Sequence, residues 1–300
     1  MEQKHALLAG GSGLIGTQLS KLLISRGWKV TGLSRTAGEK NGISYYAWNP
    51  AQRKIDPKAF EGVTHLVNLA GEGIADHRWT ASFKEKILSS RLDASATLLQ
   101  GINKIPNTIT ALIAASAIGI YGNRGDEIVD ENTSPAHDFL GTTCVQWEQS
   151  YAASPVRTVL LRTGIVLSTD GGALVPMSQP LHFFITPILG NGKQYMSWIH
   201  MDDHCRIFAE AMENEQWQGI YNAVAPFPVP HRKFMMILRE IISPKSICVP
   251  APAFALNLVL GEQSAIVLEG SNVSAQKILQ AGFKFKFPQL KEALNNLYGR

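Results

Sequence analysis

The sequence predicts an α/β fold, with a doubly wound parallel sheet followed by a smaller α+β C-terminal lobe. Through the first half of the chain, short β-rich runs alternate with helical patterns, and this alternation builds a parallel sheet with helices on both faces. A glycine cluster lies between the first run and the first helix. Beyond about residue 165 the alternation loosens, and Gly and Pro punctuate residues 171–192. We therefore expect two domains, at residues 1–168 and 169–300, with some later segments returning to the first sheet.

The expected elements follow in order along the chain. Strands are predicted at residues 5–9, 29–33, 65–70, 110–116 and 157–162, and helices at residues 14–26, 80–101 and 139–152. In the first helix Gly27 lies where a C-cap glycine belongs. The lobe is predicted to contain strands at 198–201 and 220–224 and helices at 202–213, 231–242 and 288–298.

Composition excludes several classes of protein. The 300 residues are 45% hydrophobic and carry a net charge of +4, without a run of like charges that would favour nucleic acid or a membrane anchor. Three scattered cysteines and eight scattered histidines give neither a disulfide framework nor metal-ligand spacing, so no metal is expected. The start lacks the apolar stretch of a signal peptide, and residues 251–268 are too interrupted to span a membrane. We expect a cytoplasmic protein with a small-molecule partner. The oligomeric state is left open.

The glycine cluster reads Ala-Gly-Gly-Ser-Gly-Leu-Ile-Gly over residues 9–16. It fits G-x-G-x-x-G and G-x-x-G-x-x-G between a predicted strand and a predicted helix, where the backbone can approach a pyrophosphate at the helix N-terminus. A structural turn is the alternative. This setting favours a Rossmann-like dinucleotide site, with binding residues Gly10, Gly13, Leu14, Ile15 and Gly16.

The residues after the second strand predict the kind of dinucleotide. An NAD site usually has a carboxylate there for the ribose hydroxyls, but this chain has Ser34 and Arg35. A guanidinium can pair with a 2′-phosphate in a bidentate manner, so we expect NADP(H). A solvated surface arginine is the alternative.

Several segments resemble the extended type of short-chain dehydrogenase/reductase, and more closely its atypical branch of epimerase family proteins. They are residues 68–71, 116–122, 161–166 and 198–203. The resemblance covers essentially the whole chain. It implies a Rossmann domain, bound NADP(H), and a cofactor contact through Leu69, Ala70 and Gly71.

The chain departs from that superfamily at the proton relay. No tyrosine has a lysine four residues on, and by spacing from Glu148 the usual Tyr and Lys positions hold Leu140 and Cys144. Arg91 stands where the superfamily commonly has Asn, and it is a further candidate for the cofactor site. Its expected partner is a cofactor phosphate, a substrate carboxylate or Glu72, and an exposed arginine is the alternative.

Two residues near the end of the predicted strand 110–116 are candidates for catalysis. Ser116 could hydrogen-bond a substrate carbonyl, although spacing from Tyr121 places the usual Ser/Thr position at Ala117. Tyr121 carries a proton suited to acid/base work, but no nearby lysine lowers its pKa from the usual value of about 10. A structural tyrosine is the alternative, with Glu72 or water supplying the proton.

We therefore predict an NADP(H)-binding, epimerase-like oxidoreductase acting on an unknown small molecule. A nucleotide-sugar epimerase or dehydratase and a non-catalytic NADP(H)-dependent sensor are the alternatives. Met196 stands where relatives that bind nucleotide sugars commonly have arginine, which predicts an apolar contact and a different substrate. Lys193 and Arg232 remain as substitute anion partners.

Overall fold

The computed structural model describes residues 4–299, which form two compact units made of separate stretches of chain. The first unit takes residues up to 116 and then 143–162 and 205–221, and the second takes residues 117–142, 163–204 and those from 222 onward. The chain thus crosses several times between the units and does not divide at one point. A functional boundary at residue 168 stays a prediction.

The first unit is built on one sheet with the strand order β14-β9-β7-β6-β1-β2-β4-β3. Neighbours from β4 to β7 pair in parallel, and the order reverses at β1, which creates the crevice where open α/β sheets bind ligands. The predicted doubly wound parallel sheet is confirmed. Its strands are β1 (His5–Ala9), β2 (Lys29–Ser34), β3 (Gly38–Lys40), β4 (Ile43–Asn49), β6 (His65–Asn68), β7 (Ala111–Ala117), β9 (Arg157–Thr163) and β14 (Gly219–Ala223), with β5 (Lys54–Ile55) paired to β4.

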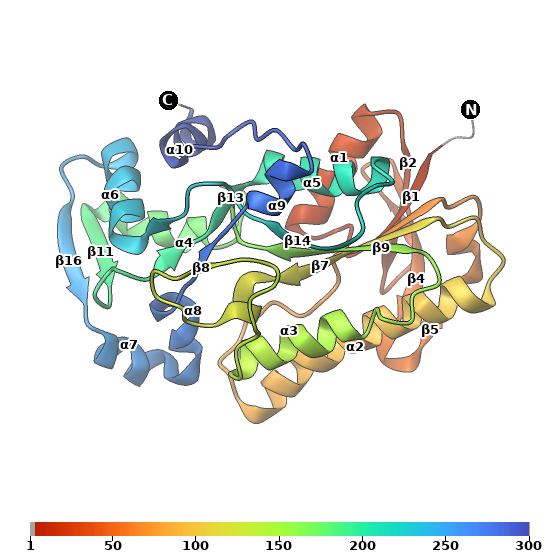
Figure 1. Ribbon diagram of the computed structural model, residues 1–300, viewed down its shortest axis with the longest axis horizontal. Helices are drawn as coiled ribbons and strands as arrows, with labels where there is room; N and C mark the ends of the chain where they lie inside the picture. Colours follow the sequence, from red (N-terminus) through yellow and green to blue (C-terminus); the bar gives the residue numbers. More distant parts are fainter. Residues whose placement is uncertain (1–3, 300) are drawn as a thin grey trace. The chain divides into compact units, whose positions relative to one another are not determined.

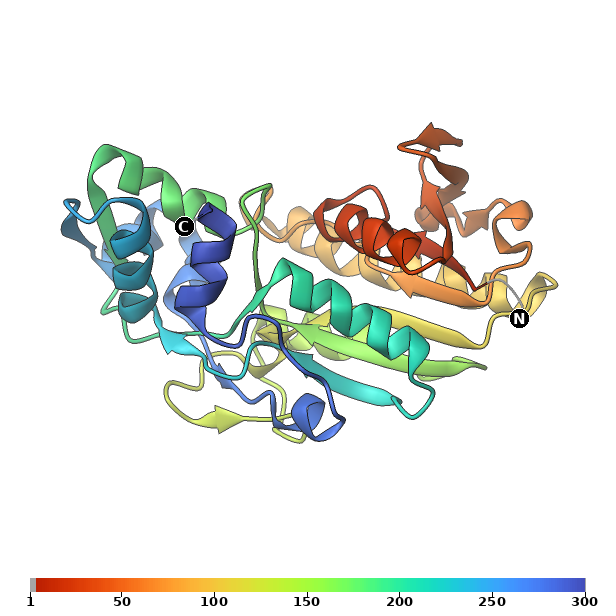
Figure 2. The ribbon, with the colours of Figure 1, turned by 90° about the horizontal axis from the view of Figure 1, so that it is seen from above.

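Helices cover both faces of this sheet. On one face α2 (Ala81–Lys104) and α3 (Phe139–Gln149) lie side by side (Figure 1), and their residues share one apolar core with the strands. On the other face α1 (Leu14–Ser25) lies beside α5 (Met201–Glu213) (Figure 2). Glu213 at the end of α5 accepts hydrogen bonds from Arg26 and Trp28, just beyond α1. Gly27 has a positive φ of 81° after the helix, as the predicted C-cap requires.

The second unit combines helices with short strand pairs. The parallel pairs are β10 (Ile165–Leu167) with β13 (Trp198–His200), β11 (Ile185–Leu189) with β16 (Ile247–Ala251), and β8 (Ile128–Val129) with β17 (Asn272–Val273), while β12 (Tyr195–Met196) and β15 (Val229–Pro230) are antiparallel. Its helices are α4 (Leu174–Ser178), α6 (His231–Ile242), α7 (Ala253–Leu260), α8 (Ala265–Leu268), α9 (Gln276–Gln280) and α10 (Leu290–Tyr298).

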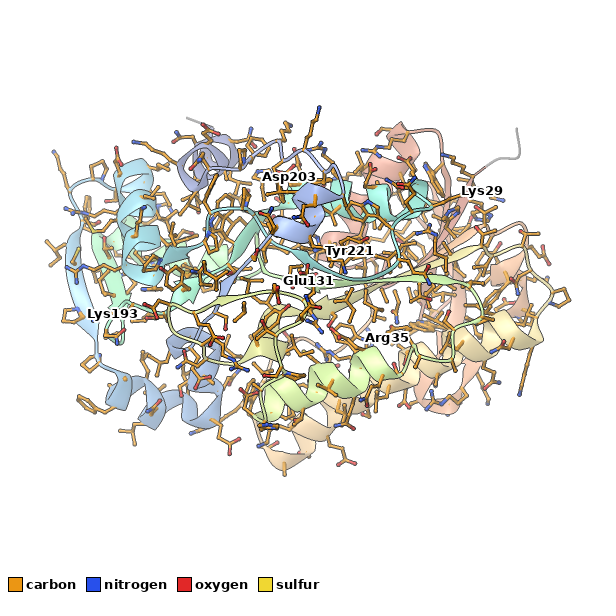
Figure 3. The ribbon with its side chains drawn as sticks, viewed as in Figure 1. Lys29, Arg35, Glu131, Lys193, Asp203 and Tyr221 are labelled. Atoms are coloured by element: carbon orange, nitrogen blue, oxygen red, sulfur yellow. The ribbon has the colours of Figure 1, made fainter. Side chains whose placement is uncertain are left out.

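Side chains from the middle of the chain fasten the C-terminal stretch of the second unit. Both carboxylate oxygens of Asp203, which is labelled in Figure 3, accept main-chain N–H groups, from Lys286 and Phe287, at 2.8 Å each. The Ser197 hydroxyl donates to the carbonyl of Ser271 and accepts from the N–H of Val273. The side chains of Asp203 and Ser197 are buried, so these bonds satisfy groups that would be costly to leave unpaired. In residues 4–299, no helix combines the length and apolar character needed to cross a bilayer.

Candidate functional site

The loop from β1 to α1 is a backbone cradle that only glycine can form. Gly10 has a φ of 79°, and a Cβ added there would lie 2.8 Å from the carbonyl carbon of Leu69. A Cβ on Gly16 would lie 2.3 Å from the Gly10 oxygen. The N–H of Gly13 donates to that same oxygen at 3.1 Å, and no side chain caps α1. The first N–H groups of α1, at Leu14 to Gly16, therefore remain available for an anion such as a pyrophosphate.

The loop after β6 lies directly against this cradle. The N–H of Leu69 donates to the carbonyl of Ala9 at 2.9 Å. The fully buried Asn68 accepts a hydrogen bond from the N–H of Ala70 and donates its own amide N–H to the Tyr151 hydroxyl at 2.7 Å. Asn68 thereby holds the turn through residues 69–71 at the sheet edge where the cofactor residues were predicted.

The end of β2 carries one positively charged side chain that has no hydrogen-bond or ion-pair partner among the described residues. Ser34 uses its hydroxyl locally and donates to the carbonyl of Thr36. Arg35, which is labelled in Figure 3, is exposed, and residues 4–299 provide it with neither a hydrogen bond nor an ion pair. Both lie at the carboxyl edge of the sheet, beside the strand that leads into the glycine loop. A 2′-phosphate at this edge could reach the free guanidinium.

The ring of Tyr45 lies next to the glycine loop, and sequence reasoning missed it. A Cβ on Gly32 would lie 2.4 Å from this ring, and one on Gly11 would lie 3.7 Å from it. Gly32 and Tyr45 are register partners on β2 and β4, so the missing side chain lets the ring lie across the sheet. The available signal was a glycine inside a predicted strand, which often marks a close approach.

Arg91 is half-buried, and its anchors are carbonyl groups. Its Nη1 donates to the carbonyls of Glu72, at 3.0 Å, and Ile87, at 2.8 Å, and its guanidinium stands 5.0 Å from the ring centre of Trp147. Of the expected partners, Glu72 contacts Arg91 through its main-chain carbonyl, while its carboxylate pairs with Lys86 at 2.7 Å. Burial lowers the pKa of Arg91, and nearby Cys144, Glu72 and Tyr151 oppose that shift. Nε and Nη2 have no hydrogen-bond partner among the described residues, so they can meet an anion.

Ser116 belongs to a buried polar cluster. Its hydroxyl donates to Oε1 of Glu148 at 2.6 Å, and Arg162 grips both oxygens of Glu148 at 2.8 Å each. The side chains of Arg162 and Glu148 are only 6% and 9% exposed. Because the hydroxyl proton is committed to Glu148, the predicted bond from Ser116 to a substrate carbonyl would require this bond to break. The catalytic assignment of Ser116 stays a prediction, with the geometry against it.

Tyr121 is fully buried in the second unit. It lies in the short 3-10 helix η3 (Ile118–Tyr121), and its hydroxyl donates to Oδ1 of Asn222 at 2.7 Å. Asn222 is held in turn, because its side chain donates to the carbonyl of Ser274 and its N–H donates to the Glu131 carboxylate. This arrangement favours the structural alternative for Tyr121, and the acid/base role stays a prediction.

Comparison with known proteins identifies the family. The model of the NAD dependent epimerase/dehydratase family matches residues 6–155, and a domain of unknown function, DUF1731, matches residues 251–297. The chain belongs to the epimerase family. It is 34% identical to the chloroplastic epimerase family protein SDR39U1 homolog of Arabidopsis thaliana, over 97% of this chain and 86% of that protein. The Bacillus subtilis epimerase family protein YfhF is 33% identical, over 97% and 96%.

Solved structures agree with this assignment. The human epimerase family protein SDR39U1, crystallised with NADPH, has a TM-score of 0.86 and 30% identity, over 98% of this chain and 99% of that one. A UDP-glucose 4-epimerase of Thermus thermophilus in complex with NAD has a TM-score of 0.76 at 19% identity, over 98% and 99%, and shows the fold alone. The chain is thus an NAD(P)-dependent epimerase-family protein with a Rossmann-like fold.

In this epimerase family protein, the buried Tyr151 beside Asn68 is not ionised near neutral pH. Burial raises the pKa of Tyr151 to about 12, despite the opposing hydrogen bond from Asn68, so its hydroxyl stays protonated. Leu140, at the usual tyrosine position, lies beside Gly119, where an added Cβ would be 3.4 Å from the leucine Cβ. Residues 4–299 also hold no group of His, Cys, Asp and Glu side chains arranged for a metal ion.

The buried position of Tyr121 leads to a prediction that separates its two roles. Tyr121→Phe leaves the amide oxygen of Asn222 without its donor, so we expect the free energy of unfolding to fall by about 1–3 kcal/mol, measured by urea denaturation. NADPH affinity and any turnover should change less than about threefold. A fall in turnover of ~10²-fold or more at unchanged stability would restore the catalytic assignment.

Proposed function

We propose that the protein binds NADP(H) and carries out hydride chemistry on a small molecule. The observation that carries the proposal is the free Arg35 guanidinium at the end of β2, where an NAD site usually places a carboxylate. The glycine cradle fits a dinucleotide pyrophosphate, because added Cβ atoms at Gly10 and Gly16 would enter it. The residues assigned to the cofactor are Gly10, Gly13, Leu14, Ile15, Gly16, Ser34, Arg35, Leu69, Ala70, Gly71 and Arg91.

Each part of the first unit has a distinct task in this proposal. The N-terminus of α1 receives the pyrophosphate through its free N–H groups and positive dipole end. Asn68 holds the 69–71 turn, whose backbone lines the edge, and the free Nε and Nη2 of Arg91 give this edge a second cation. When bound, the cofactor supplies hydride transfer, and the protein supplies binding and orientation.

Two alternatives differ in what they require. A nucleotide-sugar epimerase needs donors for a diphosphate, but Met196 is buried in the apolar core that contains Trp198, so its predicted contact is with the protein's own interior. Lys193 and Arg232 are exposed and remain candidates for that task. A non-catalytic sensor needs no acid/base group, which agrees with the buried, committed hydroxyl of Tyr121. Turnover of NADPH with a panel of carbonyl compounds distinguishes an enzyme from a sensor.

Arg35→Ala tests the cofactor. Loss of a charge-assisted pair should weaken NADPH binding on the order of ten- to a hundredfold and leave NADH binding within about twofold, measured by isothermal titration calorimetry. Lys21→Ala is the matched control, because it removes one exposed cation from α1 and should change neither affinity. Equal affinity of the unmutated protein for NADPH and NADH would contradict the proposal.

A further inference from the structure

Tyr45 projects from the face of the parallel sheet that carries α1. It is the register partner of Gly32 on β2, and Gly32 is the register partner of Leu8 on β1. Register partners project from one face, and successive residues along a strand alternate between the two faces. Leu7 and Tyr46, which adjoin this row of residues, pack in the apolar core shared with α2 and α3. Tyr45 therefore projects from the opposite face, where α1 lies (Figure 2).

Glycines on both neighbouring strands leave room for the Tyr45 ring. Its register partners are Gly32 on β2 and Gly38 on β3, so neither strand brings a side chain beside the ring. An added Cβ at Gly32 would overlap carbons of the ring, because the ring lies directly over the backbone of β2. That backbone supports the ring and limits the directions in which its hydroxyl can point.

The ring of Tyr45 leans toward the carboxyl edge of the sheet. Gly11 lies in the loop beyond the end of β1, and a Cβ added there would be 3.7 Å from Cε1 of Tyr45. This ring carbon adjoins the carbon that carries the hydroxyl. The Cα of Tyr45 is level with Gly32, and β2 continues for two more residues, about 6.6 Å, to Ser34 before Arg35 follows. The hydroxyl is thus directed toward the region between the glycine loop and the end of β2.

The Tyr45 hydroxyl is a donor without a hydrogen-bond partner among the described residues. The residue is half-buried, and burial raises the pKa of the hydroxyl, so it keeps its proton near neutral pH. Residues 4–38 and 43–49, which form β1, α1, β2 and β4, contain no Asp or Glu. Glu39 on β3 is the register partner of Ser44 and projects from the opposite face of the sheet. The hydroxyl can therefore donate to an anionic ligand.

We propose that the Tyr45 hydroxyl donates a hydrogen bond to the 2′-phosphate of NADP(H) and, with Arg35, determines the preference for this cofactor. The inference rests on the proposed function, and it extends the cofactor site to a strand outside the glycine and arginine motifs. The pyrophosphate is assigned to the start of α1, whereas β4 lies beyond β2 in the strand order. An anion at the end of β2 would therefore meet both the guanidinium and the hydroxyl.

The two side chains would contribute differently to the binding of this phosphate. Arg35 supplies charge from an exposed, flexible side chain, while the sheet positions the Tyr45 ring and directs its donor. A hydrogen bond to an ionised acceptor is roughly twice as strong as one between neutral groups. NAD(H) has a ribose hydroxyl in place of the phosphate, so it would gain less from the Tyr45 donor. Loss of the hydroxyl should thus weaken NADPH binding more than NADH binding.

Tyr45→Phe tests this proposal on the full chain, because it removes the hydroxyl and keeps the ring. Isothermal titration calorimetry should show NADPH binding weakened about tenfold and NADH binding changed less than about twofold. Adenosine 2′,5′-bisphosphate, which carries the 2′-phosphate but no pyrophosphate, should lose affinity by a similar factor. In an Arg35→Ala background the effect of Tyr45→Phe should differ from its effect alone, since two groups that bind one phosphate are energetically coupled.

Tyr46→Phe is the matched control. It removes the hydroxyl of the next residue on β4, whose ring packs against the apolar core on the other face of the sheet, and it should leave the binding of both cofactors unchanged. The melting temperature of the Tyr45→Phe variant should match that of the unmutated protein, because the ring is retained and its hydroxyl has no partner among the described residues.

The outcomes separate this inference from the proposed function. If the unmutated protein prefers NADPH and Tyr45→Phe changes NADPH affinity less than about twofold, the role of Tyr45 is overturned and the NADP(H) site stands. An equal loss of NADPH and NADH affinity would also overturn it, because the hydroxyl would then act on a part that both cofactors share. Equal affinity of the unmutated protein for the two cofactors would contradict the NADP(H) site itself, and this inference with it.

Discussion

Gly16→Ala is expected to weaken NADPH binding by about a hundredfold or more. The added Cβ would lie 2.3 Å from the Gly10 oxygen and 2.6 Å from the Gly11 Cα, both backbone atoms of the loop that would cradle the pyrophosphate. Backbone atoms cannot rotate away as a side chain can, so the loop or the start of α1 must move. A displacement of a few tenths of an ångström or more at several N–H donors would misalign the predicted phosphate contacts together.

The measurement for Gly16→Ala is calorimetric titration with NADPH, accompanied by urea denaturation. Overpacking costs about 1–3 kcal/mol, but alanine in a helix recovers up to about 1 kcal/mol, so the protein should remain folded. Gly38→Ala is the matched control, because an added Cβ at Gly38 meets nothing within 4 Å and the residue lies in β3 of the same unit. NADPH affinity within threefold of the unmutated protein would contradict the assignment of the cradle.

Arg162→Met is expected to lower the free energy of unfolding by about 3–5 kcal/mol. It would leave the Glu148 carboxylate, whose side chain is only 9% exposed, without the two 2.8 Å bonds that now offset its burial. Ser116 would supply one hydrogen bond, which is too little for a buried charge. Since α3 carries Glu148 and β9 carries Arg162, the loss would loosen the helix from the sheet.

The double variant Glu148→Leu/Arg162→Met should recover most of that stability. Buried ion pairs replaced by apolar groups of similar size are often neutral or better, apart from the Ser116 hydroxyl left without its acceptor. Lys291→Met is the matched control, because its pair with Glu240 is more than half exposed on both sides and should contribute less than about 1 kcal/mol. If the free energy of unfolding of the Arg162→Met variant is within about 1 kcal/mol of that of the unmutated protein, the buried pair has no stabilising role.

The first half of the fold was predictable because its signals are local. The elements predicted between residues 5 and 162 have continuous patterns, and the structure places each within a few residues of its predicted range. The third parallel strand, β4, was not located, since Ser44 and Tyr45 interrupt its apolar character and its pairing with β2 is non-local. The C-terminal strand pairs are only two to five residues long, too short for a period to be recognised.

The surroundings of the candidate catalytic residues could not be predicted from local patterns. Ser116 and Tyr121 were placed correctly near the end of β7, but the direction of each side chain was not predictable. Along a strand a shift of one residue reverses the face, and the bonding partners, Glu148 and Asn222, lie 32 and 101 residues away. The same limit applies to α7, a helix that we did not predict from the sequence and in which no residue is buried.

The sequence by itself determined the glycine loop after β1 and the missing carboxylate after β2, because both depend on contiguous residues whose backbone freedom and charge are intrinsic. Only the tertiary structure decided which polar groups have hydrogen-bond partners inside the protein. The Ser116 hydroxyl faces a buried ion pair, Tyr121 is enclosed, and Arg91 leaves two donors free. It also decided which apolar residues face solvent. The hydrogen-bond partners and the solvent exposure of a side chain depend on residues from distant parts of the chain, and local sequence patterns do not specify those residues.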